Sequence, residues 1–464
     1  MTSPAERQRP PLHFNAFVMN TTSHIHHGQW RRPDGGQTEF NDVRLWIELA
    51  KVLEAARFDA MFFADVTGLY GDADADYSVY VQEGLQIPSN DPLVLLGALA
   101  THTEHLGLAL TSNVAQNHPF NFARQVSTLD HLSGGRAAWN IVTGVQDNGA
   151  RNFGLPQLTD HADRYAWAEE YVEVTYKLWE GSWDDGALRK DRTGWYADPA
   201  GVHKIRHVGP RYRVEGPHLP SPSPQRTPLL FQAGSSESGR AFAARHAEAV
   251  FIVAPNPEIA RRQIADTRAR AVAFGRRPED IKFFPGLSFI IGSTEAEARA
   301  KADQYEQYVS VEAYLAHNAA VVDPDGRLYP PDTPLAEVRT NTMKGIIDYL
   351  LATITHRVPT VRDLAMKISG NRSLVGTPEQ IADRLEPWID AGIDGVNVMN
   401  WVIPGSFVEF ADHVMPVLRE RGLAQQDYAP GPLRQKLFGT PLVNDRHPAA
   451  QWRGAFRTVG ALTP

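Results

Sequence analysis

The chain has 464 residues, 42% hydrophobic and 22% charged, which is the composition of an ordinary globular protein with enough apolar material for a large core. Its formal net charge of -8 gives no basic field for a nucleic acid or an anionic membrane surface. The lack of cysteine excludes disulfides, thiolate metal sites and iron-sulfur clusters, so any redox chemistry falls to a bound cofactor. No signal peptide precedes His13 and no window is apolar enough to span a bilayer, so we expect a cytoplasmic protein.

Short β-rich apolar runs alternate with amphipathic helices, which is the pattern of βα units around a parallel sheet. Strands are predicted over residues 13–20, 59–65, 106–113, 136–143, 228–233, 249–253, 281–291 and 395–399. Helices are predicted over residues 43–57, 92–103, 122–132, 163–180, 238–246, 258–274, 294–309, 378–391 and 407–421. About eight strands, each followed by a helix, predict one α/β domain over residues 1–464, a (β/α)8 TIM barrel.

Three segments depart from this rhythm. Residues 181–226 are rich in Pro, Gly, Trp and charge and are predicted as an insertion, and residues 313–373 as a second, irregular one. The C-terminal extension 424–464 is predicted to be an arm on the surface or on a partner subunit. After the second insertion, Thr377, Pro378 and Gln380 match the capping box of a helix start.

Polar residues follow the predicted strands at their carboxyl ends, where the substrate face of a β/α barrel is built. They are Asn20, the His24–His27 cluster, Asp65, Thr111, Asn113, Asn140, Thr143, the Gln232–Ser236 segment, Asn397 and Asn400. Asp65 follows a buried run, and it is equally suited to accept from a ligand N–H or to cap the following loop. The shared face carries more weight than any one of these residues.

The turn Gly234-Ser235-Ser236 lies between a strand and a helix, so its N–H groups and hydroxyls can hold a phosphate at the helix N-terminus. An ordinary helix cap explains the same residues equally well. His161 and Tyr165 are one helical turn apart and can face one ligand, or they can belong to an amphipathic face with the tyrosine packed inward.

The histidine cluster allows a zinc site, because an H-x-H pair reaches one metal in some barrels. A metal barrel also needs further ligands, and His27 cannot easily point the same way as His26 on an extended segment. Neutral histidines that donate hydrogen bonds or shuttle protons in a substrate mouth are favoured, and no metal site is expected. Tyr70, Gln86 and His317 lie in long loops of the kind that form lids.

Residues 118–144, from His-Pro-Phe-Asn to Trp-Asn-Ile-Val-Thr-Gly, carry the strongest family signature in the chain. Further stretches extend it: Asn15–Asn20, His24–Arg31, Phe58–Val66, Ile87–Pro92, Tyr176–Trp183, Ser223–Pro228 and Gly376–Gln380. Together these stretches resemble the bacterial-luciferase-like FMN-dependent monooxygenases. The resemblance is to the branch that holds the nitrilotriacetate, dibenzothiophene-sulfone and long-chain alkane monooxygenases, and it is greatest to the alkane enzymes.

The resemblance implies a two-component enzyme that receives reduced FMN (FMNH2) from a separate NAD(P)H-dependent flavin reductase. In that family reduced FMN reacts with O2 to a C4a-peroxyflavin, which oxygenates a C–H, C–S or C–N centre of a small organic substrate, alkane-like or xenobiotic. It also implies a homodimer or homotetramer. The residues implied to hold FMN are Asp65, Thr111, Asn113, Asn140, Thr143, His161, Tyr165, Ser235 and Ser236. The implied catalytic residues on the substrate side are His24, Tyr70, Gln86 and His317.

Two positions depart from the alkane enzymes: Thr21 stands in place of a cysteine and Val145 in place of a pocket histidine. These differences bear on the identity of the substrate rather than on the flavin chemistry. Two alternatives stay open, a deazaflavin F420-dependent oxidoreductase of the same barrel superfamily and a non-catalytic flavin-binding barrel.

Overall fold

The fold is taken from a computed structural model, which describes residues 10–70, 76–234, 236–318, 329–338, 344–370 and 373–457. Ser235, one of the implied FMN residues, lies outside these ranges. Within them, eight parallel strands close into a barrel in the order β1, β2, β3, β4, β7, β8, β9, β11 and back to β1. Their bounds are β1 His13–Met19, β2 Ala60–Ala64, β3 Gly107–Asn113, β4 Ala137–Val142, β7 Leu229–Gln232, β8 Ala249–Ile252, β9 Lys282–Ile291 and β11 Gly395–Met399. The predicted TIM barrel is confirmed.

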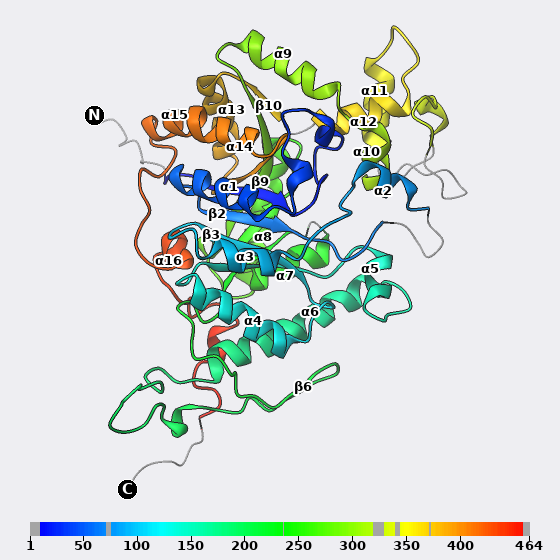
Figure 1. The fold of residues 1–464 in the computed structure, drawn as a ribbon. Helices are drawn as coiled ribbons and strands as arrows, with labels where there is room; N and C mark the ends of the chain where they lie inside the picture. Colours follow the sequence, from blue (N-terminus) through cyan, green and yellow to red (C-terminus); the bar gives the residue numbers. More distant parts are fainter. Residues whose placement is uncertain are drawn as a thin grey trace, which may run out of the picture.

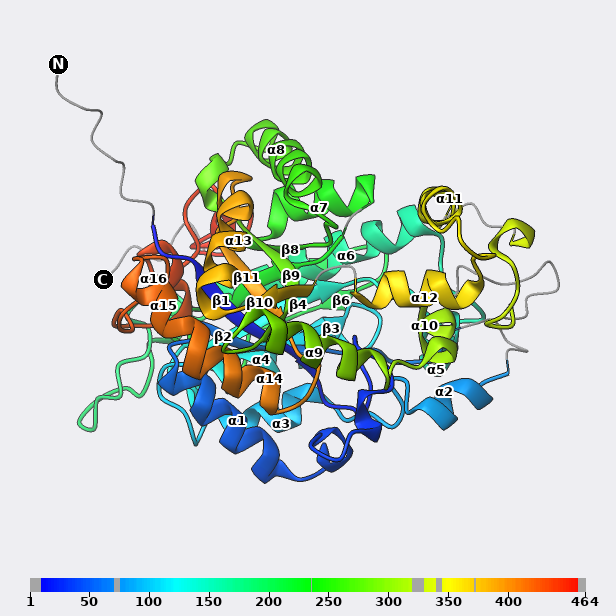
Figure 2. The same cartoon turned by 90° about the horizontal axis from the view of Figure 1, so that it is seen from above.

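Helices surround the barrel (Figures 1 and 2), and each lies where the apolar periodicity predicts it. They are α1 Val43–Ala55, α3 Pro92–Leu99, α4 Pro119–Leu132, α6 His161–Tyr176, α7 Glu237–His246, α8 Pro257–Ala273, α9 Glu295–Glu306 and α13 Pro378–Asp390. The last part of the ring is α14 Gly405–Glu409, a π-helical turn Phe410–Val414, and α15 Met415–Glu420. The predicted capping box at α13 is present, with Gln380 N–H donating to Thr377 Oγ1 and Thr377 N–H donating to Gln380 Oε1.

The prediction that the segment 313–373 is irregular is wrong. The described part contains α10 Val311–Asn318, α11 Lys344–Thr353, α12 Val361–Gly370 and a short strand, β10 Ser373–Gly376, which pairs with the end of β9. Buried Val311, Leu315 and Leu364 join these helices in their own apolar cluster. The sequence favoured an irregular segment because each helix is short and proline-rich turns separate them.

Two further short helices were not predicted, α2 Ser78–Glu83 after β2 and α5 Asp147–Asn152 after β4. Both views place α2, α5, α10 and α12 at one side of the barrel, opposite α16 Leu433–Phe438 (Figures 1 and 2). The hydroxyl of Tyr80 on α2 donates to the carbonyl of Ala316 on α10 at 3.1 Å. These elements form a roof over the carboxyl ends of the strands.

The opposite end of the barrel is closed by the arm that follows residue 424. Leu433 and Leu437 of α16 belong to the same apolar cluster as the barrel-interior side chains Phe62 and Phe231. In the insertion 181–226, a small hairpin of β5 His207–Val208 and β6 Arg213–Val214 is present, and Asp184 is ion-paired to Arg457 of the arm at 3.0 Å. The arm therefore packs on its own barrel.

Candidate functional site

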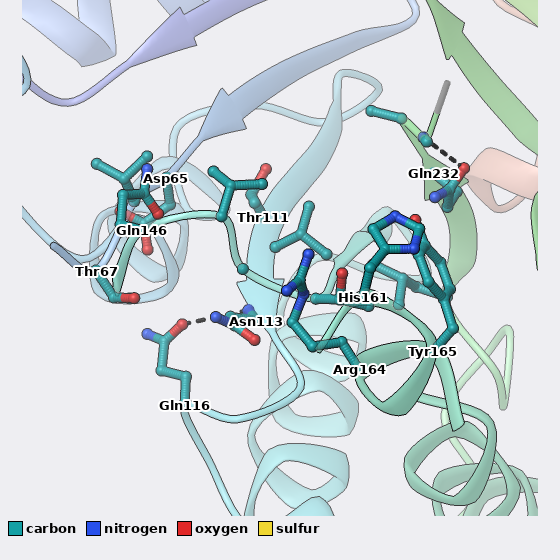
Figure 3. A pocket seen from close by; sticks show the side chains of 18 of the residues that line it. Asp65, Thr67, Thr111, Asn113, Gln116, Gln146, His161, Arg164, Tyr165 and Gln232 are labelled. Atoms are coloured by element: carbon teal, nitrogen blue, oxygen red, sulfur yellow. Dashed lines mark hydrogen bonds between the residues drawn. The ribbon is translucent and has the colours of Figure 1, made fainter. Parts of the chain in front are cut away.

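A cavity of about 310 Å³ opens at the carboxyl ends of four neighbouring strands, β2, β3, β4 and β7. This volume lies within the roughly 300–1,000 Å³ of small-molecule sites. Its lining comes from the ends of these strands and from the first turn of α6 (Figure 3): Asp65, Val66, Thr67, Tyr70, Thr111, Asn113, Gln116, Ile141–Gln146, His161, Arg164, Tyr165, Gln232–Gly234 and Ser236. Seven of the implied FMN residues, from Asp65 to Ser236, therefore share one cavity.

One end of the cavity is made by the starts of α6 and α7. Ser236 caps α7 by accepting from Gly239 N–H at 3.1 Å, and its hydroxyl is 3.0 Å from Nε2 of His161. Burial raises the pKa of Tyr165, against hydrogen bonding from Ser236 and Thr143, so the phenol stays a neutral donor. This end combines hydroxyls, an imidazole and a helix N-terminus, which is a suitable environment for an anion.

Glycine is required on both sides of the Tyr165 hydroxyl. A Cβ atom built on Gly234 would lie 2.9 Å from that oxygen, and one built on Gly239 would lie 2.8 Å from it. A side chain at either position would displace the phenol from the cavity. The absence of side chains at both positions therefore lets the backbone approach this hydroxyl closely.

Asp65, Thr67 and Gln146 form the opposite end of the cavity (Figure 3). Burial, and then the charge of Asp91, raise the pKa of Asp65 to about 7. The carboxyl group is consequently neutral over part of the physiological range and can donate as well as accept a hydrogen bond. Gln146 is buried, and its Nε2 has no hydrogen-bond partner among the described residues.

Thr111 and Asn113 lie between the two ends (Figure 3). Gly144 has a φ of +78°, and a Cβ atom there would come 2.6 Å from Nδ2 of Asn113, so glycine is needed to keep that amide in place. Asn140 does not line the cavity. It is buried beside Thr111, its partner on the neighbouring strand, and donates from Nδ2 to Oγ1 of Thr111 at 3.0 Å, so its contact with the cavity is indirect.

Arg164 and Gln146 line the cavity but were not singled out from the sequence, whereas Gln232 belongs to the predicted Gln232–Ser236 segment. Burial lowers the pKa of Arg164, and its Nε is a buried donor that has no partner within the described ranges. Arg164 directly precedes Tyr165, and helical spacing assigns such neighbours to different faces. Its side chain is long enough to reach the cavity from the neighbouring face. A cationic residue next to the His161/Tyr165 pair was the sequence feature from which it could have been predicted.

The implied catalytic residues form a second group beside the cavity. Tyr70 lines the cavity, whereas Gln86, His317 and His24 do not. The rings of Tyr70 and His317 are 5.3 Å apart, and Gln86 Nε2 is 3.5 Å from His317 Nε2. Burial, and then the neighbouring His317, lower the pKa of His24 to about 3, so this ring is neutral.

The two positions that depart from the alkane enzymes lie in different places. Val145 lines the cavity and is 67% exposed, so its isopropyl group faces the entrance rather than the core. Thr21 is buried and donates from its hydroxyl to the carbonyl of Pro88 at 2.7 Å. Only Val145 is in a position to contact a ligand directly.

The histidine cluster does not gather ligands for a metal. Across the described segments, no three His, Asp or Glu side chains lie close enough together to hold a metal ion. His26 instead stacks on Trp401 with 3.7 Å between ring centroids. The helices of the same segments are all too short or too polar to cross a membrane.

Comparison with known proteins identifies the family. The luciferase-like monooxygenase profile matches residues 19–395. The chain belongs to the luciferase-like monooxygenase family. It is 42% identical to the long-chain alkane monooxygenase of Geobacillus thermodenitrificans, over 97% of this chain and 99% of that protein. It is 41% identical to the dimethyl-sulfide monooxygenase of Hyphomicrobium sulfonivorans, over 95% of this chain and 94% of that protein.

Solved structures of luciferase-like proteins match almost the whole chain. A crystal structure of a long-chain alkane monooxygenase superposes with a TM-score of 0.86 at 41% identity, covering 96% of this chain and 100% of that one. A riboflavin lyase, solved with a modified FMN and riboflavin, gives a TM-score of 0.84 at 36% identity, covering 96% and 99%. The chain is therefore an enzyme of this family.

Proposed function

We propose that this protein is a two-component flavin-dependent monooxygenase that uses reduced FMN and O2 to oxygenate a small organic substrate. The observation that carries the proposal is the cavity itself. It is built at the carboxyl ends of β2, β3, β4 and β7, with an end at Tyr165 and Ser236 that suits an anion and a carboxyl at Asp65. The named monooxygenases among its relatives support the same reaction class.

The residues present fit FMN. Its phosphate would be held by Ser236, Tyr165 and the start of α7, where Gly234 and Gly239 bring the backbone close to the Tyr165 hydroxyl and where Arg164 Nε is a buried donor without a partner among the described residues. Its ring would lie toward Asp65 and Gln146, whose buried groups offer both donors and acceptors. When bound, reduced FMN supplies the activation of O2.

The chain's own residues orient the reactants and exclude water. Apolar Val66, Ile141 and Val142 line the cavity between its polar ends, and Tyr70 lies at the side where His317 and Gln86 stand. Apolar walls limit the access of water, which protects a reactive oxygen species from loss to solvent. The phenol of Tyr70, whose pKa burial raises, stays protonated and can donate to an oxygen atom in the cavity.

The proposed substrate class rests on the named relatives and on Val145 at the cavity entrance. The relatives named above act, by their names, on an alkane and on a thioether. We propose a small substrate with a C–H, C–S or C–N reacting centre that enters past Val145. By family resemblance, the reduced cofactor would come from a separate NAD(P)H-dependent reductase, and the enzyme would be a cytoplasmic homodimer or homotetramer.

The proposal is tested in two steps with the purified full-length protein. Reduced FMN, oxidised FMN and reduced F420 are titrated separately under anaerobic conditions, and binding is followed by calorimetry. We expect reduced FMN to bind most tightly. The protein, reduced FMN and a panel of alkanes, thioethers and secondary amines are then exposed to ¹⁸O2, and we expect one labelled oxygen atom in a product.

Each outcome separates the proposal from its alternatives. Preferential binding of reduced F420 over reduced FMN would favour the F420-dependent oxidoreductase. Binding of FMN with oxidation no faster than that of free flavin and no labelled product from any compound would point to a non-catalytic flavin-binding barrel.

A further inference from the structure

A chain of polar contacts runs from the loop after β1 to the wall of the cavity. Oγ of Ser23 is 2.8 Å from Nδ1 of His27, and Nε2 of His27 is 2.7 Å from Nδ1 of His317. On its other side, Nε2 of His317 is 3.5 Å from Nε2 of Gln86. The side-chain amides of Gln146 and Gln86 both lie beside the phenol of Tyr70, which lines the cavity.

The rings of His27 and His317 are in direct contact, so the position of the proton on one ring depends on the other. Burial, and then the nearby His317, lower the pKa of His27 well below its usual value, so the ring carries one N–H. A direct contact between two imidazole nitrogens at 2.7 Å needs one proton between them. The question is therefore which of the two rings donates.

The orientation of the Gln86 amide indicates which of the two histidine rings donates. Its Nε2 lies toward His317 and Tyr70, while its Oε1 is buried and has no partner among the described residues. If the amide were turned over, two buried N–H donors would lack partners in place of one carbonyl oxygen, which is the costlier arrangement. The amide of Gln86 therefore donates to Nε2 of His317, and the proton of His317 must be on Nδ1.

The position of Gln86 is itself fixed by the backbone. Its φ of +54° is in the left-handed region, and its N–H donates to the carbonyl of Ser23 at 3.0 Å. A non-glycine residue in this conformation is held there by its surroundings and is often functional. The side chain of Gln86 consequently approaches His317 from a constrained direction.

His27 is anchored as firmly as Gln86. Its carbonyl accepts from the N–H of Ser310, the residue before α10, and its ring meets the ring of Tyr314 edge-on at 4.8 Å. His317 lies on the same helix. His27 thus contacts α10 at its start through the backbone and near its end through the imidazole.

We propose that His27 is a positioning residue that keeps the proton of His317 on Nδ1, so that the Nε2 lone pair accepts from Gln86. The inference rests on the proposed function for its catalytic meaning. The Gln86 amide approaches the phenol of Tyr70 together with the amide of Gln146, and the Tyr70 hydroxyl lines the cavity. His27 thereby sets the polarity of a hydrogen-bonded chain whose last donor meets the reactants.

The test reads the tautomer of His317 directly in flavin-free protein labelled with ¹⁵N-histidine. Long-range ¹H–¹⁵N correlation distinguishes a ring protonated at Nδ1 from one protonated at Nε2, and a His317→Gln protein identifies the resonance. We expect Nδ1–H in the wild-type protein. His27→Phe keeps the ring shape but removes the acceptor, and we expect the His317 signal to move toward the Nε2–H form.

His27→Gln is the matched control, because its amide oxygen can accept from His317 Nδ1–H. We expect this variant to keep the wild-type tautomer and most of the turnover. In His27→Phe we expect kcat for the oxygenation to fall on the order of tenfold, with the KM for reduced flavin nearly unchanged. Wild-type His317 protonated at Nε2, or an unchanged tautomer in His27→Phe, overturns the assignment.

The two proposals fail separately. If no substrate is oxygenated while the tautomer responds to His27→Phe as expected, the proposed function is wrong and the positioning role of His27 stands. If oxygenation is found but the tautomer is insensitive to His27, the positioning role is wrong and the monooxygenase function stands.

Discussion

The carboxyl group of Asp65 lies where its charge is penalised. Its pKa is raised to about 7 by burial and by the charge of Asp91, although Asp91 itself is useful as the N-cap of α3. A carboxyl whose folded pKa exceeds its unfolded value binds an extra proton on folding. Through this group, stability is greatest at low pH and falls as the pH rises from about 4 to 7.

Asp65→Asn is expected to stabilise the flavin-free protein. The amide carries no charge, so the gain over wild type should grow from about pH 4 to pH 7 and stay constant above, reaching about 4 kcal/mol. Urea unfolding at pH 5 and pH 8 measures the difference. Identical pH dependence of the two proteins would show that the carboxyl is unperturbed. We also expect weaker binding of reduced FMN, because the ring loses its carboxyl partner.

The double variant Tyr165→Phe/Ser236→Ala tests the anion-binding end. Both hydroxyls are removed from the cavity while its shape is nearly kept. Hydrogen bonds to a charged group contribute about 1.5–3 kcal/mol each, so the Kd for reduced FMN should rise by at least about tenfold. Anaerobic calorimetry measures it. Riboflavin, which has no phosphate, serves as the control ligand, and an equal loss of its affinity would show that the hydroxyls act elsewhere.

At the scale of elements, α10 depends on the loop after β1. Gly28 has a φ of +92°, and a Cβ atom there would lie 2.0 Å from the carbonyl oxygen of Tyr308, just before α10 begins. The loop and the helix can approach this closely only because residue 28 has no side chain. The orientation of His317 on α10 is therefore coupled to a backbone contact at the other end of the helix.

Gly28→Ala is expected to loosen α10. Alanine at a positive φ costs about 1 kcal/mol, and the contact with Tyr308 adds a displacement of the helix start. Hydrogen exchange should become faster at residues 311–317 and stay unchanged in the barrel strands. Gly422→Ala is the control, because Gly422 has a φ of +72° with no atom within 4 Å of a built Cβ. Equal effects of the two variants on residues 311–317 would contradict the coupling.

At the scale of the whole molecule, one buried ion pair joins the arm to the barrel. The guanidinium of Arg434 contacts both oxygens of Glu248, Nε to Oε1 at 2.6 Å and Nη2 to Oε2 at 2.8 Å. Arg434 is also bonded to the carbonyls of Pro228 and Pro441. Both partners are almost completely shielded from solvent.

Arg434→Met should destabilise the protein by about 3–5 kcal/mol, because it leaves the carboxylate of Glu248 buried without its partner. Adding Glu248→Gln removes that charge and should recover part of the loss. Arg457→Ala, which breaks a pair with Asp184 in which the arginine is 63% exposed, should change stability by less than about 1 kcal/mol. Chemical unfolding compares the three, and equal losses would show that burial of the pair is unimportant.

The barrel could be predicted from the sequence because each strand and helix repeats a local signal. Apolar runs such as Met61–Phe63 and the capping box at Thr377 are contained within a few residues. Strand ends at one face then follow from the topology, and they brought Asp65, Thr111 and Asn113 to one cavity. The predicted order of strands was therefore sufficient to locate much of the candidate site.

The remaining features depend on contacts between distant segments. Nothing local shows that Thr111 lines the cavity while Asn140 does not, because the two are register partners on neighbouring strands and are bonded to each other. The helices of the segment 313–373 are stabilised by packing on one another. The contact of His27 with His317 joins residues 290 positions apart. Such features depend on tertiary contacts, and the periodicity of apolar residues along the sequence does not predict these contacts.

The closure of the barrel by the arm has a consequence for folding during translation. Arg434 lies 186 residues after Glu248, and Leu433 fills the barrel base only after β11 has been made. A ribosome that has finished all eight strands therefore still carries an open-ended cylinder, with an uncompensated carboxylate and bare phenylalanines at its base. The segment that seals it is translated after all eight strands, so a chain interrupted before this segment exposes the surfaces that attract chaperones and proteases.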